Sequence, residues 1–303
     1  MIFEFENTMN ERVIIPNKTG VELYIKREDK LHTFVSGNKC RKLKYNLLEA
    51  DNSGFKTLLT FGGAFSNHIA AVASAGRLLG FNTIGVVRGE ELERKINSNP
   101  TLSFAKRNGM QFKFVCREVY RNKTNEDFLK YLKDEFGDFY LIPEGGTNGL
   151  AIAGCEEILS DSDKDFDYVC CAVGTGGTIS GLINCSKPSQ QVLGFPALKG
   201  DFLKEDISKF ATKNNWKLIT DYHFGGYAKI NTELVSFINQ FKDVNNVPLD
   251  PVYTGKMLFG IFGLIEKNYF PKGSKILAIH TGGLQGIEGM NVFLRKKNLP
   301  LIN

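Results

Sequence analysis

Residues 168–178 read Tyr-Val-Cys-Cys-Ala-Val-Gly-Thr-Gly-Gly-Thr, an apolar run that ends in a cluster of glycines. Uninterrupted apolar residues from 169 to 173 predict a strand buried on both faces, which is typical of a parallel sheet covered by helices. The glycines predict a sharp turn into a helix, whose free N–H groups and threonine hydroxyls favour an anion such as phosphate. On this loop alone, a glycine-rich turn kept for packing is the alternative.

The same order of strand, turn and helix repeats along the chain. Strands are predicted at residues 57–61, 83–87, 112–116, 139–142, 168–173, 191–195 and 275–280. Amphipathic helices are predicted at residues 39–51, 67–79, 102–108, 126–136, 151–160, 178–185, 233–241 and 256–268. This alternation predicts an α/β fold with parallel sheets.

Four of the predicted strands are followed, after at most two intervening residues, by clustered glycines, at residues 62–63, 145–146, 174–177 and 282–283. In open α/β sheets, ligands bind outside the carboxyl ends of the strands. The four loops are therefore predicted to gather around one ligand site.

The composition is that of an ordinary globular protein, with 42% hydrophobic residues, 23% charged residues and a formal net charge of +5. The short basic runs at residues 39–44 and 295–297 are predicted to be solvated faces of helices, so no nucleic-acid partner is expected. No uncharged stretch approaches the roughly 20 residues that span a bilayer, and no signal-peptide pattern opens the chain. We expect a cytoplasmic protein without a membrane partner.

The six cysteines include no Cys-x-x-Cys pair. Cys170 and Cys171 are adjacent in a predicted buried strand, so their side chains should point to opposite faces of the sheet. Reduced core thiols explain this pattern better than disulfides or zinc. His32 and His223 show no metal-ligand spacing, and His280 is expected to pack or hydrogen-bond, so no metal is predicted.

Two further stretches carry candidate ligand groups. Ser36-Gly-Asn-Lys-Cys-Arg-Lys-Leu43 presents Lys39 at a helix start, where an isolated lysine would usually be solvated. In Phe61-Gly-Gly-Ala-Phe-Ser-Asn-His68, the polar side chains open a helix and could either cap it or bind a carboxylate. Thr281 would place a hydroxyl at the carboxyl edge of the last strand.

Together with Lys26-Arg-Glu-Asp29, Gly225-Gly-Tyr227 and Leu249-Asp-Pro-Val-Tyr-Thr-Gly-Lys256, these motifs follow one another in a familiar order. The chain resembles the fold-type-II pyridoxal 5′-phosphate (PLP) enzymes, and within them the 1-aminocyclopropane-1-carboxylate (ACC) deaminase / D-cysteine desulfhydrase family. The resemblance implies PLP as cofactor and a homodimer. It implies two α/β domains with open, largely parallel sheets and a cofactor cleft between them: a large domain of residues 1–42 and 151–303, and a small inserted domain of residues 43–150.

The resemblance also implies roles for individual residues. Lys39 would be the Schiff-base lysine and the base that removes the α-proton. The remaining catalytic side chains would be Ser66, Tyr227 and Tyr253; the cofactor would be held by Lys39, Asn67, Gly174, Thr175, Gly176, Gly177, Thr178 and Thr281; and the substrate by Ser66, Asn67 and His68.

The choice of substrate depends on fewer residues. Thr254 stands where ACC deaminases tend to have a glutamate that faces the pyridine nitrogen, and a threonine there would favour a neutral ring. With Thr281, this favours α,β-elimination on a small amino acid, with D-cysteine giving pyruvate, sulfide and ammonia as the leading hypothesis. The alternatives are ACC deamination to 2-oxobutyrate, elimination on D-serine or a β-chloro amino acid, and a catalytically idle PLP-binding protein.

Overall fold

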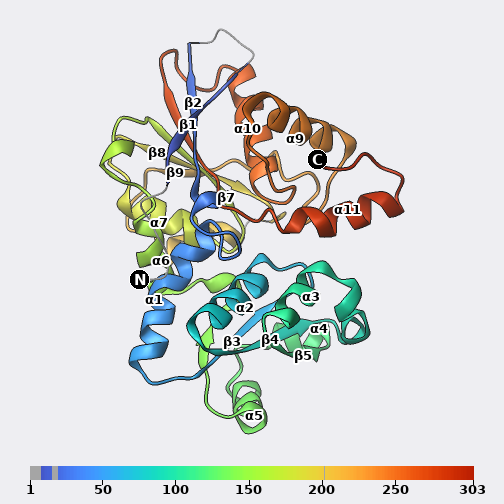
Figure 1. The fold of residues 1–303 in the computed structure, drawn as a ribbon. Helices are drawn as coiled ribbons and strands as arrows, with labels where there is room; N and C mark the ends of the chain where they lie inside the picture. Colours follow the sequence, from blue (N-terminus) through green and yellow to red (C-terminus); the bar gives the residue numbers. More distant parts are fainter. Residues whose placement is uncertain (1–7, 16–19, 201) are drawn as a thin grey trace.

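The computed structural model describes residues 8–15, 20–200 and 202–303, and they form two sheets flanked by helices (Figure 1). The larger sheet has the strand order β1-β2-β10-β7-β8-β9, and only β1 is antiparallel to its neighbour. Its strands are β1 (Asn10–Val13), β2 (Glu22–Lys26), β7 (Tyr168–Val173), β8 (Gln191–Pro196), β9 (Trp216–Leu218) and β10 (Lys275–Ile279).

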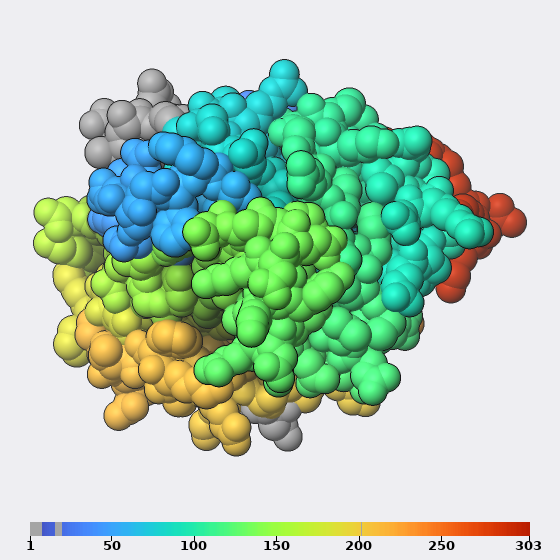
Figure 2. All heavy atoms as spheres, turned by 90° about the horizontal axis from the view of Figure 1, so that it is seen from below, coloured from blue at the N-terminus to red at the C-terminus, as the bar shows by residue number. Residues whose placement is uncertain are grey.

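The smaller sheet has the order β5-β4-β3-β6 and is parallel throughout. Its strands are β3 (Thr57–Gly62), β4 (Asn82–Arg88), β5 (Gln111–Val115) and β6 (Tyr140–Ile142). Seen from below, the cyan and green segments of this part of the chain cover much of the molecule and adjoin the blue segment of the first helix (Figure 2).

The helices connect the strands and cover both sheets. They are α1 (Asn38–Asn52), α2 (Asn67–Leu79), α3 (Pro100–Arg107), α4 (Arg117–Arg121), α5 (Glu126–Phe136), α6 (Gly149–Glu156), α7 (Gly177–Cys185), α8 (Phe202–Ser208), α9 (Thr232–Asn245), α10 (Thr254–Glu266) and α11 (Gly286–Lys296). Short 3-10 helices lie at η2 (Glu28–Lys30), η3 (Glu90–Ser98), η4 (Glu144–Gly146) and η5 (Asp161–Asp163). Within the described part of the chain, no helix has the length and apolar character needed to cross a membrane.

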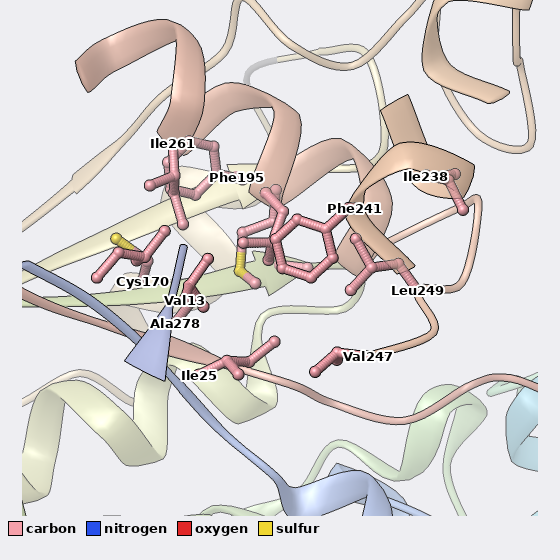
Figure 3. Close-up of a cluster of buried hydrophobic side chains, with 14 of the residues drawn as sticks. Val13, Ile25, Cys170, Phe195, Ile238, Phe241, Val247, Leu249, Ile261 and Ala278 are labelled. Carbon is pink, nitrogen blue, oxygen red and sulfur yellow. The ribbon is translucent and has the colours of Figure 1, made fainter. Parts of the chain in front are cut away.

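The larger sheet is buried on both faces, as the apolar run at 169–173 predicts. One face packs against α9 and α10, and Cys170 belongs to that core (Figure 3). The other face packs against α6, α7 and α8, and Cys171 belongs to that second core. The two cysteines therefore point to opposite faces, as predicted, and all six cysteines are free thiols.

The smaller sheet is sandwiched in the same way. Leu58 of β3 packs with α1, α2 and α3, while Leu59 faces the opposite side, where Tyr120 of α4 and Leu132 of α5 cover the sheet. The predicted domain boundary between residues 42 and 43 falls inside α1. Side chains of this helix from Cys40 onward pack in the small-domain core.

The α/β fold class and every predicted strand are confirmed, with ends that differ by at most one residue. The strands β1, β2 and β9 were not predicted. β1 and β9 are the edge strands of the larger sheet and have three or four residues each, too few to show a period of two clearly. β2 alternates between polar and apolar residues, a pattern that its five residues carry only weakly.

Candidate active site

A cavity of about 380 Å³ lies where β3, β4, β6, β7 and β10 end, between the two sheets. It brings together most of the residues predicted from the sequence: Lys39, Ser66, Asn67, His68, Gly174, Thr175, Gly176, Thr178, Tyr227, Tyr253 and Thr281. Gly177 is the one predicted residue outside this lining. Segments that are far apart in sequence thus meet at the carboxyl edges of both sheets, where α/β proteins bind their ligands.

The start of α1 holds Lys39 in this cavity. Gly37, just before the helix, has a φ of 61°, and a Cβ there would lie 2.1 Å from the carbonyl oxygen of Thr281. Only glycine permits so close an approach. The N–H of Asn38 donates to the same carbonyl over 3.3 Å, so the lysine-bearing helix starts directly against the loop after β10.

The amine of Lys39 is prepared for deprotonation. Burial, reinforced by the nearby positive charge of Lys42, lowers the pKa of Lys39 to about 7. Its Nζ donates to Oδ1 of Asn38 over 3.0 Å, and Nδ2 of Asn38 donates to Thr178 Oγ1 over 2.8 Å. Asn38 therefore links the lysine to the glycine loop after β7.

Lys42 is a functional candidate that the sequence analysis did not assign. Its buried Nζ donates to the carbonyl oxygen of Gly145 over 2.9 Å and to Thr147 Oγ1 over 3.0 Å, and lies 3.5 Å from Thr175 Oγ1. The amine thus stands at the glycine loop of residues 174–177. The spacing of three residues from Lys39, which puts both side chains on one face of α1, is the signal that could have found it.

The loop after β7 enters α7 through two glycines, so no side chain covers the backbone at the start of this helix. Gly176 adopts the left-handed conformation with a φ of 83°. A Cβ on Gly177 would lie 2.8 Å from Thr147 Oγ1 and 3.0 Å from the Lys42 Nζ, so a side chain there would fill the space around the amine. Helix N–H groups, hydroxyls and a cation converge here as an anion site requires.

The start of α2 contributes the polar groups of the small domain. Ser66 caps the helix by accepting from the N–H of Ile69 over 3.3 Å, and it also lines the cavity. Capping and ligand binding are therefore compatible, because the hydroxyl proton is not used by the cap. The side chain of Asn67 lies against the backbone of the other domain, since a Cβ on Gly283 would be 2.6 Å from its Nδ2.

His68 is buried and neutral. Its Nε2 lies 2.8 Å from Thr60 Oγ1, and that hydroxyl donates to the carbonyl oxygen of Ile142 over 2.8 Å. Because the Thr60 hydroxyl proton is already used, we assign the ring proton to Nε2; Nδ1 makes no hydrogen bond of normal geometry within the described residues. Burial and the charges of Lys39 and Lys42 hold the pKa of His68 well below its usual value.

Two tyrosines approach the cavity from the larger domain. The rings of Tyr227 and Tyr253 are 6.3 Å apart and nearly perpendicular, and a Cβ on Gly174 would lie 3.1 Å from the Tyr253 ring. Burial, together with repulsion from Tyr227 and Asp250, raises the pKa of Tyr253 well above its ordinary value. Its hydroxyl therefore keeps its proton at neutral pH and can donate a hydrogen bond.

The prediction that Thr254 faces the ligand is wrong. Thr254 is fully buried, is not among the lining residues, and donates its hydroxyl to Oδ1 of Asp250 over 2.8 Å. Asp250 also accepts from the N–H groups of Val252, Tyr253 and Thr254 at 2.7–3.0 Å and so caps α10. Thr281, by contrast, does line the cavity.

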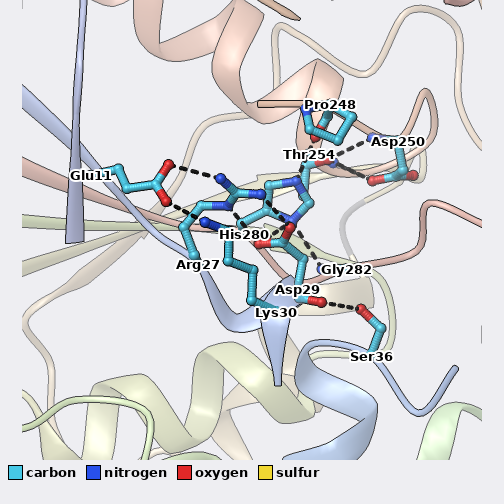
Figure 4. A network of polar contacts seen from close by, with 10 residues as sticks. All are labelled: Glu11, Arg27, Asp29, Lys30, Ser36, Pro248, Asp250, Thr254, His280 and Gly282. Atoms are coloured by element: carbon cyan, nitrogen blue, oxygen red, sulfur yellow. Dashed lines mark hydrogen bonds and ion pairs between the residues drawn. The ribbon is translucent and has the colours of Figure 1, made fainter. Parts of the chain in front are cut away.

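A polar network beneath Thr281 holds the ends of β2 and β10 together (Figure 4). His280 donates from Nε2 to the carbonyl oxygen of Pro248 over 2.7 Å and accepts from the N–H of Gly282 at Nδ1 over 3.2 Å, so it packs and hydrogen-bonds as predicted. Asp29 binds Arg27 through both oxygens at 2.8–2.9 Å, and its carbonyl oxygen accepts from Ser36 Oγ over 3.0 Å. Within the described ranges, no three His, Cys, Asp or Glu side chains are grouped as a metal site.

Comparison with known proteins agrees with this geometry. Residues 13–282 match the family model described as pyridoxal-phosphate dependent enzyme. The chain is 32% identical over 296 residues to a putative ACC deaminase of Pyrococcus horikoshii, covering 90% of this chain and 87% of the relative. It is 31% identical over 304 residues to the mitochondrial bifunctional D-cysteine desulfhydrase/ACC deaminase of Arabidopsis thaliana, covering 90% of this chain and 74% of that protein.

Solved structures share the architecture. A crystal structure of an ACC deaminase homologue aligns with a TM-score of 0.78 at 29% identity, over 92% of this chain and 90% of that one. A hydrogen sulfide-producing enzyme from Fusobacterium nucleatum aligns with a TM-score of 0.67 at 16% identity, over 92% of this chain and 96% of that one, which establishes a common fold only.

Proposed function

Because this chain belongs to the family of pyridoxal-phosphate dependent enzymes, we propose that it is a PLP-dependent lyase that removes the β-substituent and the amino group of a small amino acid. D-Cysteine, giving pyruvate, sulfide and ammonia, is the leading substrate. The observation that carries the proposal is the amine of Lys39, whose pKa is lowered to about 7 in a cavity that also holds an anion site.

The residues of the cavity fit the cofactor. The phosphate group would be held at residues 174–178 and by Lys42, whose amine already stands among hydroxyl and carbonyl oxygens of this loop region. Gly177 supports this assignment, because a side chain there would occupy the space beside the amine. Lys39 would hold the aldehyde carbon, while Asn67 and Thr281 lie in the same cavity as further contacts.

PLP, when bound, supplies an electron-withdrawing ring that stabilises negative charge at the substrate Cα. The chain supplies the proton transfers. Lys39 is partly unprotonated near neutral pH, so its Nζ can accept the Cα proton as a general base. The hydroxyl of Tyr253 keeps its proton, and with Tyr227 it can donate to a departing group.

The start of α2 would bind the substrate carboxylate. Ser66 has a hydroxyl proton that its capping bond does not use, and the helix N-terminus carries a partial positive charge. His68 is also proposed as a substrate contact. Because its ring is neutral, it would act there by hydrogen bonding or by positioning α2 through Thr60, not by charge.

The second candidate is ACC deamination to 2-oxobutyrate, which the names of the relatives favour. Thr281 lines the cavity at the end of β10 and supports elimination as the first choice. Elimination on D-serine or a β-chloro amino acid is a variant of the same chemistry. A PLP-binding protein without turnover is the alternative from another class.

The test is keto-acid formation by the PLP-loaded protein, offered D-cysteine and ACC in parallel. Pyruvate from D-cysteine supports the proposal, 2-oxobutyrate from ACC supports the second candidate, and neither product supports the idle binding protein. Lys39→Ala should abolish turnover while its thermal unfolding stays cooperative. Wild-type turnover in this variant would refute the role of Lys39.

We further propose that the enzyme is a cytoplasmic homodimer that acts on free amino acids and binds no nucleic acid. Light scattering coupled to size-exclusion chromatography would give the mass in solution, to be compared with the 33.8 kDa of one chain.

A further inference from the structure

Arg88, at the end of β4, brings a positive charge to the cavity that the proposed reaction does not use. It lines the cavity with Ser66 and Tyr227. In the pairing of β3 with β4, Gly62 is opposite Val87, so the next residues, Gly63 and Arg88, follow side by side at the carboxyl end of the sheet. The register therefore puts the arginine beside the loop that leads to the start of α2.

Gly63 leaves room for the arginine head group. A Cβ on Gly63 would lie 3.8 Å from a terminal guanidinium nitrogen of Arg88, and it is the only contact that such an atom would make within 4 Å. No other side chain therefore stands between the guanidinium and the backbone of Gly63. The donors of Arg88 are available to a molecule bound in the cavity.

The charge of Arg88 lacks a carboxylate partner within the described residues. Its guanidinium carbon lies 5.7 Å from the centre of the Tyr120 ring, a cation–π contact that leaves its N–H groups unused. Glu144, the acidic residue that lines the cavity, is already bound by the hydroxyl of Tyr120 at 2.7 Å and by Lys123 Nζ at 3.1 Å. The rim of the cavity is thus prepared for an added negative charge.

The proposed function already assigns the α-carboxylate of the substrate to Ser66 and the start of α2, so Arg88 is not needed to bind it. Arg88 and Tyr227 line the same cavity, and the proposed function puts Tyr227 near the leaving group. Burial raises the pKa of Tyr227, and the nearby charge of Arg88 partly opposes that rise. A second anionic group on the substrate would therefore meet Arg88 on the side of the β-substituent. Arginine suits such a group because its planar fork binds oxyanions with two parallel hydrogen bonds.

We propose that Arg88 binds an anionic β-substituent, and that the substrates of this enzyme include small amino acids with a sulfonate or phosphate on Cβ. This inference rests on the proposed elimination and names its substrate class. For a sulfonate, the Cα–H and Cβ–S bonds break, the electron pair of the latter leaves with sulfite, and water replaces the amino group. Cysteate and water thus give pyruvate, ammonium and bisulfite; O-phosphoserine and water give pyruvate, ammonium and hydrogen phosphate.

The test compares kcat/KM for cysteate and O-phosphoserine with that for β-chloroalanine, whose β-substituent is uncharged, using both enantiomers of each. In Arg88→Gln, the ratio of the anionic to the uncharged substrate should fall roughly 10- to 100-fold, mainly through KM, because a charge-assisted hydrogen bond is lost. The matched control is Arg94→Gln, which removes an exposed arginine of η3 that does not line the cavity. Its ratio should match that of the wild type.

Each outcome bears on one of the two proposals. An unchanged ratio in Arg88→Gln overturns the role of Arg88, and so does an equal loss of kcat/KM for all three substrates. The role is also overturned if the wild-type enzyme turns over β-chloroalanine but neither anionic amino acid. Cysteate and O-phosphoserine separate a sulfonate from a phosphate preference. If no substrate yields pyruvate, the elimination itself fails, and binding of cysteate and O-phosphoserine to the PLP-loaded protein, followed by its absorbance, decides whether Arg88→Gln weakens anion binding.

Discussion

Lys42 allows the assignment of the phosphate site to be tested without any assumption about the substrate. Its Nζ stands within 2.9–3.5 Å of three oxygens around the glycine loop, so a phosphate there would accept a charge-assisted hydrogen bond from it. Such a bond is worth about 1.5–3 kcal/mol. Lys42→Gln should therefore raise the Kd for PLP roughly 10- to 150-fold.

The assay is an equilibrium titration of the apo protein, followed by absorbance, with PLP and with pyridoxal, which lacks the phosphate. Loss of Lys42 also removes its repulsion of Lys39 and so raises the pKa of that amine, but this effect weakens both ligands alike. Only PLP should suffer the additional loss. Equal losses for the two ligands, or no loss, would refute a phosphate contact. The control is Lys44→Gln, whose amine binds Glu157 outside the cavity and should leave both affinities unchanged.

Three further predictions concern stability. The lowered pKa of Lys39 should make the unfolding free energy of the apo protein rise with pH between about 7 and the ordinary value of 10.5, because in that range only the unfolded chain binds the proton. Denaturant titrations at pH 7 and 9 should show that Lys39→Met lacks this rise. An unchanged rise in that variant would contradict the lowered pKa. Gly37→Ala should lower the free energy of unfolding by more than about 3 kcal/mol, since its Cβ would meet a backbone carbonyl at 2.1 Å. Gly54 has a φ of 77° but lies in open space, so Gly54→Ala should lower it by about 1–2 kcal/mol. Similar losses in melting temperature for the two variants would exclude the close contact. Glu28→Gln breaks a buried ion pair and should cost about 3–5 kcal/mol in urea, against at most about 1 kcal/mol for the half-exposed Glu135→Gln; the reverse order would refute the burial argument.

The sequence could predict the central strands and the glycine loops because both are local patterns. The apolar run at 169–173 and the turn after it carry their own evidence of burial on both faces, and the same applies to residues 57–63. Edge strands carry less evidence in their own sequence, because a three-residue segment such as Trp216–Leu218 becomes a strand only by pairing with β8. Their formation depends on neighbours that are distant in the sequence.

In the site, too, local patterns could be predicted and long-range contacts could not. Glycine loops and helix starts indicated most of the residues that line the cavity, but the side chains that complete it act across domains. Lys42 meets Gly145 across 103 residues and Thr147 across 105. Thr254 was expected near the pyridine ring because it follows Tyr253 in the motif that resembles the family. That failed because adjacent residues at a helix start diverge: Tyr253 lines the cavity, whereas Thr254 binds Asp250.

The two sheets divide the proposed work between them. Lys42, the glycine loop after β7, Tyr253 and Thr281 surround the cavity from α1 and the larger domain, and these are the groups assigned to the cofactor and the proton transfers. Ser66 and Arg88 come from strand ends of the smaller sheet and are assigned to the substrate. A change in a loop of the smaller sheet would then alter the choice of substrate while the cofactor stays in place. Arg88→Gln should accordingly leave the Kd for PLP unchanged, and a loss of cofactor affinity in that variant would show that the two tasks are not separable.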